Sequence, residues 1–349
     1  MTRNDVAEAA GVSTAIVSYV VNDGPRPVSR ETRQKVLETI DRLGYKPNAV
    51  ARNLRRQRTS TLGLILPDTH NPYFAEVARA VEQTAYESGF TVMICHSDYK
   101  LERELHYVSV LHAERAAGVI WFPATTNPEP AIRLAEYGVP LVVLDRIVEA
   151  PRVYSIVADN FRGGYIAAQH LLNLGHRRIG CIARPHDLHH SQERIRGYLS
   201  AMKENGLPFD ESLVVKGGFR LEDGREAALK LLALQPPPTA IFAYNDFMAI
   251  GALRAVLERG LKVPGDLSIV GFDDIPQSAF TYPALTTIRL PKHEMGSKGA
   301  KLLLDLVNKK RPKKVESPLA VHLIIRESTS FAPEKLLMDI DLSGTISRS

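Results

Sequence analysis

Short apolar runs that alternate with amphipathic segments are the feature that most constrains the fold of this chain. From residue 61 onward nine such runs recur: TLGLILP, FTVMICH, GVIWFP, PLVVLD, YSIVAD, RIGCIA, LVVKG, TAIFAY and LSIVGF. Runs of this kind are typical of strands buried on both faces of a parallel sheet, and the amphipathic segments predict the helices that cover those faces. The helices are expected at 73–88, 100–113, 161–174, 191–205, 222–234 and 246–259. Because nine strands exceed one ordinary sheet, the pattern predicts two lobes, with a crossover near 153–162.

The first 46 residues lack this alternation and are typical of three short helices. Thr2 and Asp5 have the spacing of a capping box, Ser29 predicts a helix start, and Gly11 and Gly44 predict helix ends. The apolar residues expected to close a small core are Val6, Ala7, Ala10, Ile16, Val17, Val20, Val21, Val36, Leu37, Ile40 and Leu43. Two short helices joined by a tight turn, with a third packed across them, predict a helix-turn-helix.

The second of these helices exposes a face that is small and uncharged. In a helix-turn-helix this helix enters the major groove, where its side chains reach base edges and phosphates. A helix that is merely solvated would carry lysine and glutamate on that face, so DNA binding is favoured over the alternative, a small bundle that binds nothing. The residues predicted to contact DNA are Thr14, Ala15, Ser18, Tyr19 and Asn22.

All the excess positive charge of the chain lies in this N-terminal region. Residues 1–60 contain 11 lysines and arginines against 6 acidic residues, and the remaining residues contain 33 of each, so the net charge of +5 belongs to the first sixth of the chain. This asymmetry indicates a small module for a polyanion joined to a neutral body. A solvated basic surface is the alternative that charge alone leaves open.

The segment YKPNAVARNLRRQRTS joins the module to the body. Pro47 ends the third helix, Asn48 caps a new one, and that helix is only about two turns long, too short to be stable alone. Arginines in such a segment bind phosphates, and an apolar side chain can wedge between base steps from the minor groove. Contacts to DNA are predicted for Ala51, Leu54 and Arg55. A charged linker with an incidental leucine is the alternative.

Polar and aromatic side chains follow the predicted strands of the body. In open parallel sheets, ligands bind beyond the carboxyl ends of the strands. Carboxylates, an amide, a guanidinium and aromatic rings suit a sugar or a base. The residues predicted to bind a small-molecule effector are Tyr73, Phe74, Asp145, Arg146, His190, Arg194, Phe219, Asn245, Asp246 and Asp273. Capping of the following helices is the alternative for strand-end carboxylates, and it stays open for Asp145 and Asp159.

The motifs DVAEAAGVSTAIVSYVVN and VSRETRQKVLETIDRLGYKPNAVARNL resemble the DNA-binding head and hinge of the lactose-repressor/galactose-repressor (LacI/GalR) family. In the body, NPYFAEVARAVEQTAYESGF, PTAIFAYND and VPGDLSIVGFDD are similar to the effector domain of that family. The resemblance implies a homodimeric transcriptional regulator, expected to be a repressor, that binds a near-palindromic operator in double-stranded DNA. It also implies a hinge helix that folds on the operator with Leu54 as its wedge, while Tyr19 replaces the Arg or His of well-known members and leaves the operator sequence open.

The resemblance also bears on the effector. Arg194, Asn245 and Asp273 correspond to residues that hold sugar hydroxyls in sugar-responsive members, and Phe74 and Phe219 correspond to aromatics that sandwich the base in purine-responsive ones. Two substitutions disfavour a purine, namely Leu188 in place of an arginine and Leu290 in place of a glutamine. A sugar or related polyol is therefore the favoured effector.

These observations together predict an N-terminal all-α helix-turn-helix domain followed by a two-lobed α/β effector domain of the periplasmic-binding-protein-like (type I) fold. The predicted head spans 1–46, the hinge helix and linker 47–59, the effector-binding and dimerisation domain 60–331, and a tail 332–349. Within the effector domain, the first lobe is expected to comprise 60–159 and 291–318, and the second lobe 160–290 and 319–331.

Several functional classes find no support in the sequence. No phosphate loop, nucleophile elbow or metalloprotease motif is present, which disfavours an enzyme, and no cofactor is expected. The histidine-rich run 186–190 has no partner motif with metal-ligand spacing, so no metal is expected. Two cysteines, no apolar stretch of membrane length and no secretory signal predict a cytoplasmic protein that associates with the nucleoid when bound to its operator. The rival hypotheses are a sugar-binding protein without a DNA role and, less favoured, a sugar-processing enzyme.

Overall fold

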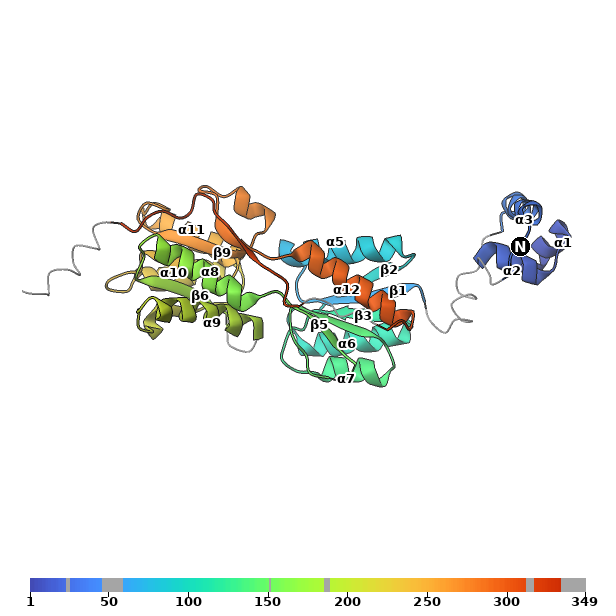
Figure 1. Cartoon of the computed structure of the whole chain (residues 1–349), viewed down its shortest axis with the longest axis horizontal. Helices are drawn as coiled ribbons and strands as arrows, with labels where there is room; N and C mark the ends of the chain where they lie inside the picture. Colours follow the sequence, from blue (N-terminus) through green and yellow to red (C-terminus); the bar gives the residue numbers. More distant parts are fainter. Residues whose placement is uncertain (23–25, 46–58, 151, 185–188, 312–316, 334–349) are drawn as a thin grey trace, which may run out of the picture. The chain divides into compact units, whose positions relative to one another are not determined.

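A computed structural model describes residues 1–22, 26–45, 59–150, 152–184, 189–311 and 317–333 of the chain. The chain divides into two compact units, Met1–Thr59 and Ser60–Ser349 (Figure 1). Of the predicted hinge helix and linker 47–59, residues 47–58 lie outside the described residues, as do residues 185–188 and the tail from residue 334 onward.

The first unit contains the three predicted helices, α1 (Arg3–Ala10), α2 (Thr14–Asn22) and α3 (Arg30–Leu43). Thr2 and Asp5 form the predicted capping box, and the Ser29 side chain accepts from the Thr32 amide at the start of α3. Gly11 and Gly44 end α1 and α3 with φ of 62° and 59°, a left-handed conformation that glycine adopts without steric cost. The helix boundaries therefore follow directly from local capping.

The core of this unit corrects one expectation. Val6, Ala7, Ala10, Val17, Val20 and Val36 are buried, as predicted. Leu37, however, is 46% exposed, and Thr39 is buried in its place with its hydroxyl donating to the Lys35 carbonyl. Val36, Thr39, Ile40 and Leu43 follow helical spacing along one face, and one residue further along a helix turns the side chain by about 100°. Leu37 is therefore rotated out of the core.

The second unit contains two sheets. The first sheet is entirely parallel and has the strand order β2-β1-β3-β4-β5. Helices α5 and α12 pack together on one of its faces, and α6 and α7 cover the other (Figure 1). The bounds are β1 (Thr61–Leu66), α5 (Pro72–Glu87), β2 (Thr91–His96), α6 (Leu101–Ala113), β3 (Gly118–Trp121), α7 (Glu129–Glu136), β4 (Leu141–Leu144), β5 (Tyr154–Ile156) and α12 (Lys292–Val307).

The second sheet has the order β11-β10-β9-β8-β6-β7, and only β11 runs antiparallel to its neighbour. Helices α8 and α9 form one packed pair, and α10 and α11 form another. The bounds are α8 (Asn160–Asn173), β6 (Ile179–Ala183), α9 (His189–Glu204), η1 (Glu211–Leu213), β7 (Val214–Lys216), α10 (Leu221–Leu232), β8 (Ala240–Ala243), α11 (Asp246–Glu258), β9 (Ser268–Asp273), η2 (Pro276–Ala279), β10 (Thr286–Arg289) and β11 (His322–Ile324).

The predicted two-lobed α/β body is confirmed, and all nine apolar runs form strands, β1 to β9. Six elements were not among those expected: α7, α12, β10, β11 and the short 3-10 helices η1 and η2. Strand β10 has the sequence TTIR, and Thr286 and Thr287 are polar residues that the structure buries. Helix α12 contains two glycines, which lower helix propensity, and Gly296 is needed because a Cβ there would lie 2.6 Å from the Val77 carbonyl oxygen.

Three chain segments connect the two lobes. The chain passes from β5 into α8, returns from β10 into α12, and crosses again at 317–322. Ala158 and Leu319 form an isolated parallel bridge between two of these segments, with amide-to-carbonyl bonds at Leu319–Val157 and Asp159–Leu319. Short connections of this kind let two lobes change their angle without unfolding either sheet.

No helix in the described part of the chain is long and apolar enough to cross a lipid bilayer. The described residues also contain no group of three or more His, Cys, Asp or Glu that could hold a metal ion. The side chains of the run 186–190 lie outside what the structure describes.

Candidate functional site

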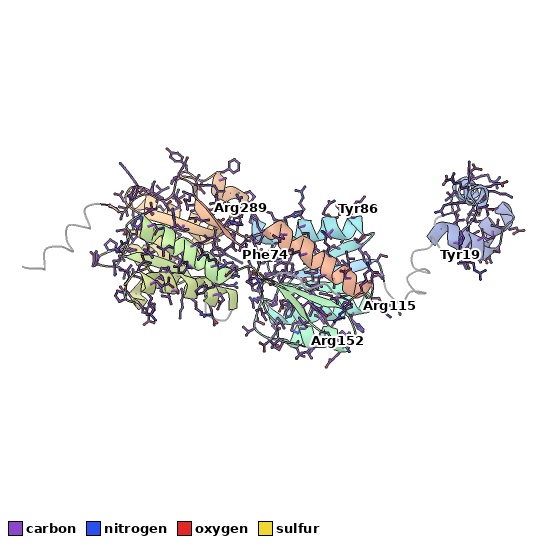
Figure 2. All side chains as sticks on the ribbon, viewed as in Figure 1. Tyr19, Phe74, Tyr86, Arg115, Arg152 and Arg289 are labelled. Carbon is purple, nitrogen blue, oxygen red and sulfur yellow. The ribbon has the colours of Figure 1, made fainter. Side chains whose placement is uncertain are left out.

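The exposed face of α2 presents the side chains that the sequence predicted to contact DNA. Thr14 and Ala15 are exposed, and Ser18 and Tyr19 are partly exposed on the same helix (Figure 2). The side chain of Asn22 and the whole of Ala51, Leu54 and Arg55 lie outside the described residues. The basic residues of the head that are described are all exposed: Arg3, Arg26, Arg30, Arg33, Lys35 and Arg42.

The second candidate site is a cleft at the carboxyl ends of the strands, lined by residues of both lobes. Phe74 lies at the junction of the lobes (Figure 2). Eight of the ten predicted effector residues line the cleft: Tyr73, Phe74, Asp145, Arg146, Arg194, Phe219, Asn245 and Asp273. The lining residues that sequence reasoning did not select are Pro67, Asn71, Tyr99, Phe122, Pro123, Leu144, Arg184 and Tyr244.

Arg194 is the most constrained side chain of the cleft. Its Nε donates to Asn160 Oδ1 at 2.8 Å, and its Nη1 donates to the Tyr244 carbonyl at 2.7 Å and lies 3.6 Å from Asp273 Oδ1. The guanidinium carbon lies 3.7 Å from the centroid of the Phe272 ring. Hydrogen bonds in the plane of the guanidinium and the Phe272 ring against its face together fix the side chain. It can therefore bind a ligand with little further loss of side-chain conformational entropy.

Two glycines let the backbone of α9 near Arg194 lie close to α8. A Cβ on Gly164 of α8 would clash with the Arg194 carbonyl oxygen, and a Cβ on Gly197 would clash with the Phe161 carbonyl oxygen. The two helices therefore approach more closely than side chains would allow. This close approach puts Arg194 within reach of Asn160 at the start of α8.

Two buried carboxylates face the cleft on strained backbone. Asp145 follows β4 with φ of 70°, and Asp273 ends β9 with φ of 114°. Burial raises the pKa of Asp273 to about 8, although Arg194 opposes the shift, and burial also raises the pKa of Asp145. The Tyr73 hydroxyl contacts the Asp145 carboxyl group and opposes the rise of its pKa, but Asp145 Oδ1 is buried without a hydrogen-bond partner among the described residues. Backbone strain and an unpaired buried acceptor are typical of a site that a ligand completes.

The capping alternative holds for one strand-end acid and not for the other. The Asp159 side chain accepts from the Arg162 amide at 2.8 Å and caps α8. Asp145 caps no helix in the described structure. Asn245 does both: its Oδ1 caps α11 by accepting from the Met248 amide, and its Nδ2 donates to the Phe219 carbonyl at the cleft wall.

The prediction for Asp246 was wrong. Asp246 is fully buried away from the cleft, and its oxygens accept from the Thr287 hydroxyl, the Ser278 hydroxyl and the Ile275 amide. It is the first residue of α11, and its side chain points beneath β9 and β10, whereas Asn245 one residue earlier faces the cleft. Its role is therefore to fix the chain after β9. For His190, the structure does not describe the side chain.

Tyr99 and Arg184 are functional candidates that sequence reasoning missed. The ring centroids of Tyr99 and Phe219, from opposite lobes, lie 4.1 Å apart, and the Arg184 guanidinium carbon lies 4.8 Å and 5.0 Å from them. Arg184 directly follows β6, and Tyr99 follows β2 by three residues in a left-handed conformation. The strand-end rule, applied to every strand, would have found both.

Arg146 is held by backbone carbonyls of a loop that is itself fixed by Glu104. Its guanidinium donates to the carbonyl of Thr125 at 2.7 Å, and burial lowers its pKa to about 10, so it stays charged at neutral pH. The loop that carries Thr125 is fixed by Glu104, which accepts from the Trp121 indole and from the Ala124 amide, both at 2.7 Å. Glu104 therefore positions the wall of the cleft without lining it.

Each of the two units matches a known protein family. The family described as "Bacterial regulatory proteins, lacI family" matches residues 2–48, and "Periplasmic binding protein-like domain" matches residues 168–329. The chain is 40% identical to the HTH-type transcriptional regulator DegA of Bacillus subtilis and 38% identical to the HTH-type transcriptional repressor PurR of Pasteurella multocida, each over 94% of this chain and 98% of the relative. Its fold is similar to the Lac repressor dimer bound to operator and the anti-inducer ONPF, with a TM-score of 0.82, 30% identity, and coverage of 95% and 99%.

Proposed function

The chain belongs to the lacI family of bacterial regulatory proteins, and from that premise we propose that a small hydroxylated molecule in the cleft controls its affinity for operator DNA. It is a DNA-binding transcriptional regulator with a helix-turn-helix head, and not an enzyme.

One observation carries the proposal. The cleft is lined from both lobes by charged side chains that are already oriented, and Asp145 presents a buried acceptor that no described residue satisfies. A ligand that donates to Asp145 in the first lobe and contacts Arg194 or Asp273 in the second lobe would favour one lobe angle over others. A ligand shifts an equilibrium between two lobe angles only if it binds one of them more tightly than the other. A cleft lined by both lobes provides this difference, because its contacts change with the lobe angle.

A sugar or related polyol is the effector class that we propose. Carboxylates, an amide and a guanidinium match vicinal hydroxyl groups, and the rings of Phe74, Phe122 and Phe219 match the apolar face of a sugar. Leu290, whose departure from the purine-responsive pattern argued against a purine, is buried and does not line the cleft. The residues that line the cleft, and not Leu290, therefore favour a sugar.

On the DNA side, we propose that α2 reads the major groove through Thr14, Ala15, Ser18, Tyr19 and Asn22. The hinge would bind the minor groove through Ala51, Leu54 and Arg55, with Leu54 inserted at a central base step. Such a regulator would act in the cytoplasm, where its operator lies, and repression is the expected outcome of operator binding.

A homodimer on a near-palindromic operator is the proposed assembly. Exposed apolar side chains gather at two places on the body. Tyr86 projects from α5 (Figure 2). The edge strand β2, which contacts α5, exposes Met93 and Ile94. In the second lobe, Phe280 and Tyr282 are 88% and 91% exposed. Exposed apolar groups of this kind mark protein interfaces, and a two-fold dimer presents its heads to two half-sites.

Selection of double-stranded DNA from a random library by the full-length protein tests the function. We expect enrichment of a two-fold symmetric sequence, and a change of affinity for that sequence of about 5- to 150-fold when the effector is added. Equal affinity for the selected and scrambled duplexes, with and without a panel of sugars, would contradict the proposal. The variant Tyr19→Ala is expected to lose selectivity between the two duplexes.

A further inference from the structure

Arg184 differs from the other two guanidinium groups of the cleft in what surrounds it. Arg194 lies 3.6 Å from Asp273, and Arg146 donates to the carbonyls of Thr125 and Ala124. Arg184 contacts the rings of Tyr99 and Phe219, and no described carboxylate forms an ion pair with it. Its closest described contacts are therefore the two aromatic rings.

This arrangement leaves the hydrogen-bonding edge of Arg184 available. A guanidinium that lies over aromatic rings uses its faces, while its five N–H donors point outward in the plane of the group. That planar edge matches a carboxylate or a phosphate, which it binds through two parallel hydrogen bonds. Arg184 is half-buried, and partial burial strengthens the attraction of its charge to an anion.

The charge of Arg184 acts inside the cleft. It lowers the pKa of Asp145 on the opposite lobe, and it lowers the pKa of Arg146, although burial is the larger influence on both groups. Both Arg184 and Asp145 line the same cleft, so one ligand can contact the two residues. The unpartnered Oδ1 of Asp145 requires a donor, and a hydroxyl group supplies one.

We propose that the effector is a polyhydroxylated anion, a sugar acid or a sugar phosphate, whose anionic group binds Arg184 while its hydroxyl groups bind Asp145. This inference rests on the proposed function of the cleft as the effector site. The anion would pair with a cleft guanidinium that forms no ion pair and donates to no carbonyl among the described residues, and it would join the second lobe to the Tyr99 wall of the first.

Calorimetric titration of the full-length protein tests the inference with three anions, D-gluconate, D-glucuronate and D-glucose 6-phosphate, and with D-glucose and D-ribose as neutral sugars. We expect at least one anion to bind about 10- to 100-fold more tightly than the neutral sugars, the range that a charge-assisted hydrogen-bond pair provides. The carboxylates and the phosphate monoester separate the two sources of the anionic group. Inorganic phosphate is included to measure the contribution of the anion alone.

Arg184→Gln is the diagnostic variant, because it removes the charge and keeps a side chain of similar length. We expect this variant to lose the preference for the anion, so that the ratio of anion affinity to neutral-sugar affinity falls toward one. Arg220→Gln is the matched control, since Arg220 also lies near the Phe219 ring, at 5.8 Å, but does not line the cleft. Asp187→Asn tests the acid nearest to Arg184 in sequence, which lies outside the described residues, and it should leave the preference unchanged.

The outcomes separate this inference from the proposed function. Tighter binding of neutral sugars than of every anion, or an unchanged anion preference in Arg184→Gln, would overturn the inference and leave the cleft as an effector site. Binding of neither the anions nor the neutral sugars would overturn both proposals.

Discussion

Asp145 and Asp273 show how a single residue is prepared for binding. Both are buried, both have positive φ, and both have a pKa raised by burial. At Asp145 the buried Oδ1 also has no partner among the described residues, and a buried polar atom without a partner is unfavourable in the free protein. A ligand that donates a hydrogen bond to such an atom removes this free-energy cost. Ligands with a donor at that position therefore bind more tightly than ligands without one.

The pH dependence of stability tests this account at Asp273. A carboxyl group with a folded pKa of about 8 keeps its proton in the folded protein while the unfolded chain, with a pKa near 4, loses it. The free energy of unfolding therefore falls as pH rises from about 4 to 8. Asp273→Asn removes this titration, so the stability of the variant relative to the wild type should increase with pH across that window.

Urea unfolding of the ligand-free protein at several pH values measures the effect. Asp266→Asn, a change of the same kind at an exposed position, serves as the control and should show the pH profile of the wild type. A constant difference between Asp273→Asn and the wild type from pH 4 to 8 would contradict the assignment.

At the scale of elements, the close packing of α8 on α9 couples the second lobe to the cleft. Gly164 and Gly197 let the helix backbones meet, and this approach brings Asn160 of α8 to Arg194 of α9. The site therefore depends on helix positions as much as on its own residues.

Gly164→Ala is expected to force the two helices apart. The added Cβ would clash with the backbone carbonyl of Arg194, which a side-chain rotation cannot relieve. Overpacking of this kind costs about 1–3 kcal/mol of stability, and displacement of Arg194 should also weaken effector binding. Thermal unfolding and calorimetry measure the two effects, and Gly265→Ala, where a Cβ would find its nearest neighbour at 3.5 Å, should change neither.

The hinge is the second element with a predicted role. Leu54→Ala should weaken binding to the selected operator more than binding to nonspecific DNA, because a wedge is used only where the central base step deforms. Fluorescence anisotropy at fixed salt measures both affinities. Leu37→Ala removes an exposed leucine from α3 and should affect the two DNAs equally. An equal loss on both DNAs for Leu54→Ala would rule out the wedge.

For the whole molecule, paired heads require a body that dimerises. The edge strand β2 and the segment after η2 expose the apolar side chains that we assign to this contact. Operator affinity should therefore depend on the association of two bodies, since one head contacts only one half-site.

The double variant Ile94→Glu, Tyr282→Glu should be monomeric at micromolar concentration, because burying two unpaired charges in an interface is unfavourable. Sedimentation equilibrium measures the assembly, and anisotropy should show a large loss of operator affinity. Ile132→Glu and Phe209→Glu, which change apolar side chains that are also exposed but lie at other positions, should remain dimeric. A dimeric double variant would move the interface elsewhere.

The sequence by itself determined the elements and much of the site. Capping residues such as Thr2 and Ser29 act on amides three residues away, and strand and helix periodicities are local, so three helices and nine strands could be predicted. The rule that ligands bind at the carboxyl ends of strands then selected most of the cleft.

Only the tertiary structure decided which strand-end side chains face the cleft. Asn245 and Asp246 are adjacent and equally polar, yet Asp246 turns beneath β9 and β10, where Ser278 and Thr287 supply its donors. Tyr99 meets Arg184 and Phe219 only because two lobes come together. These contacts join residues far apart in the chain, and local periodicity carries no information about which distant groups will satisfy a buried side chain.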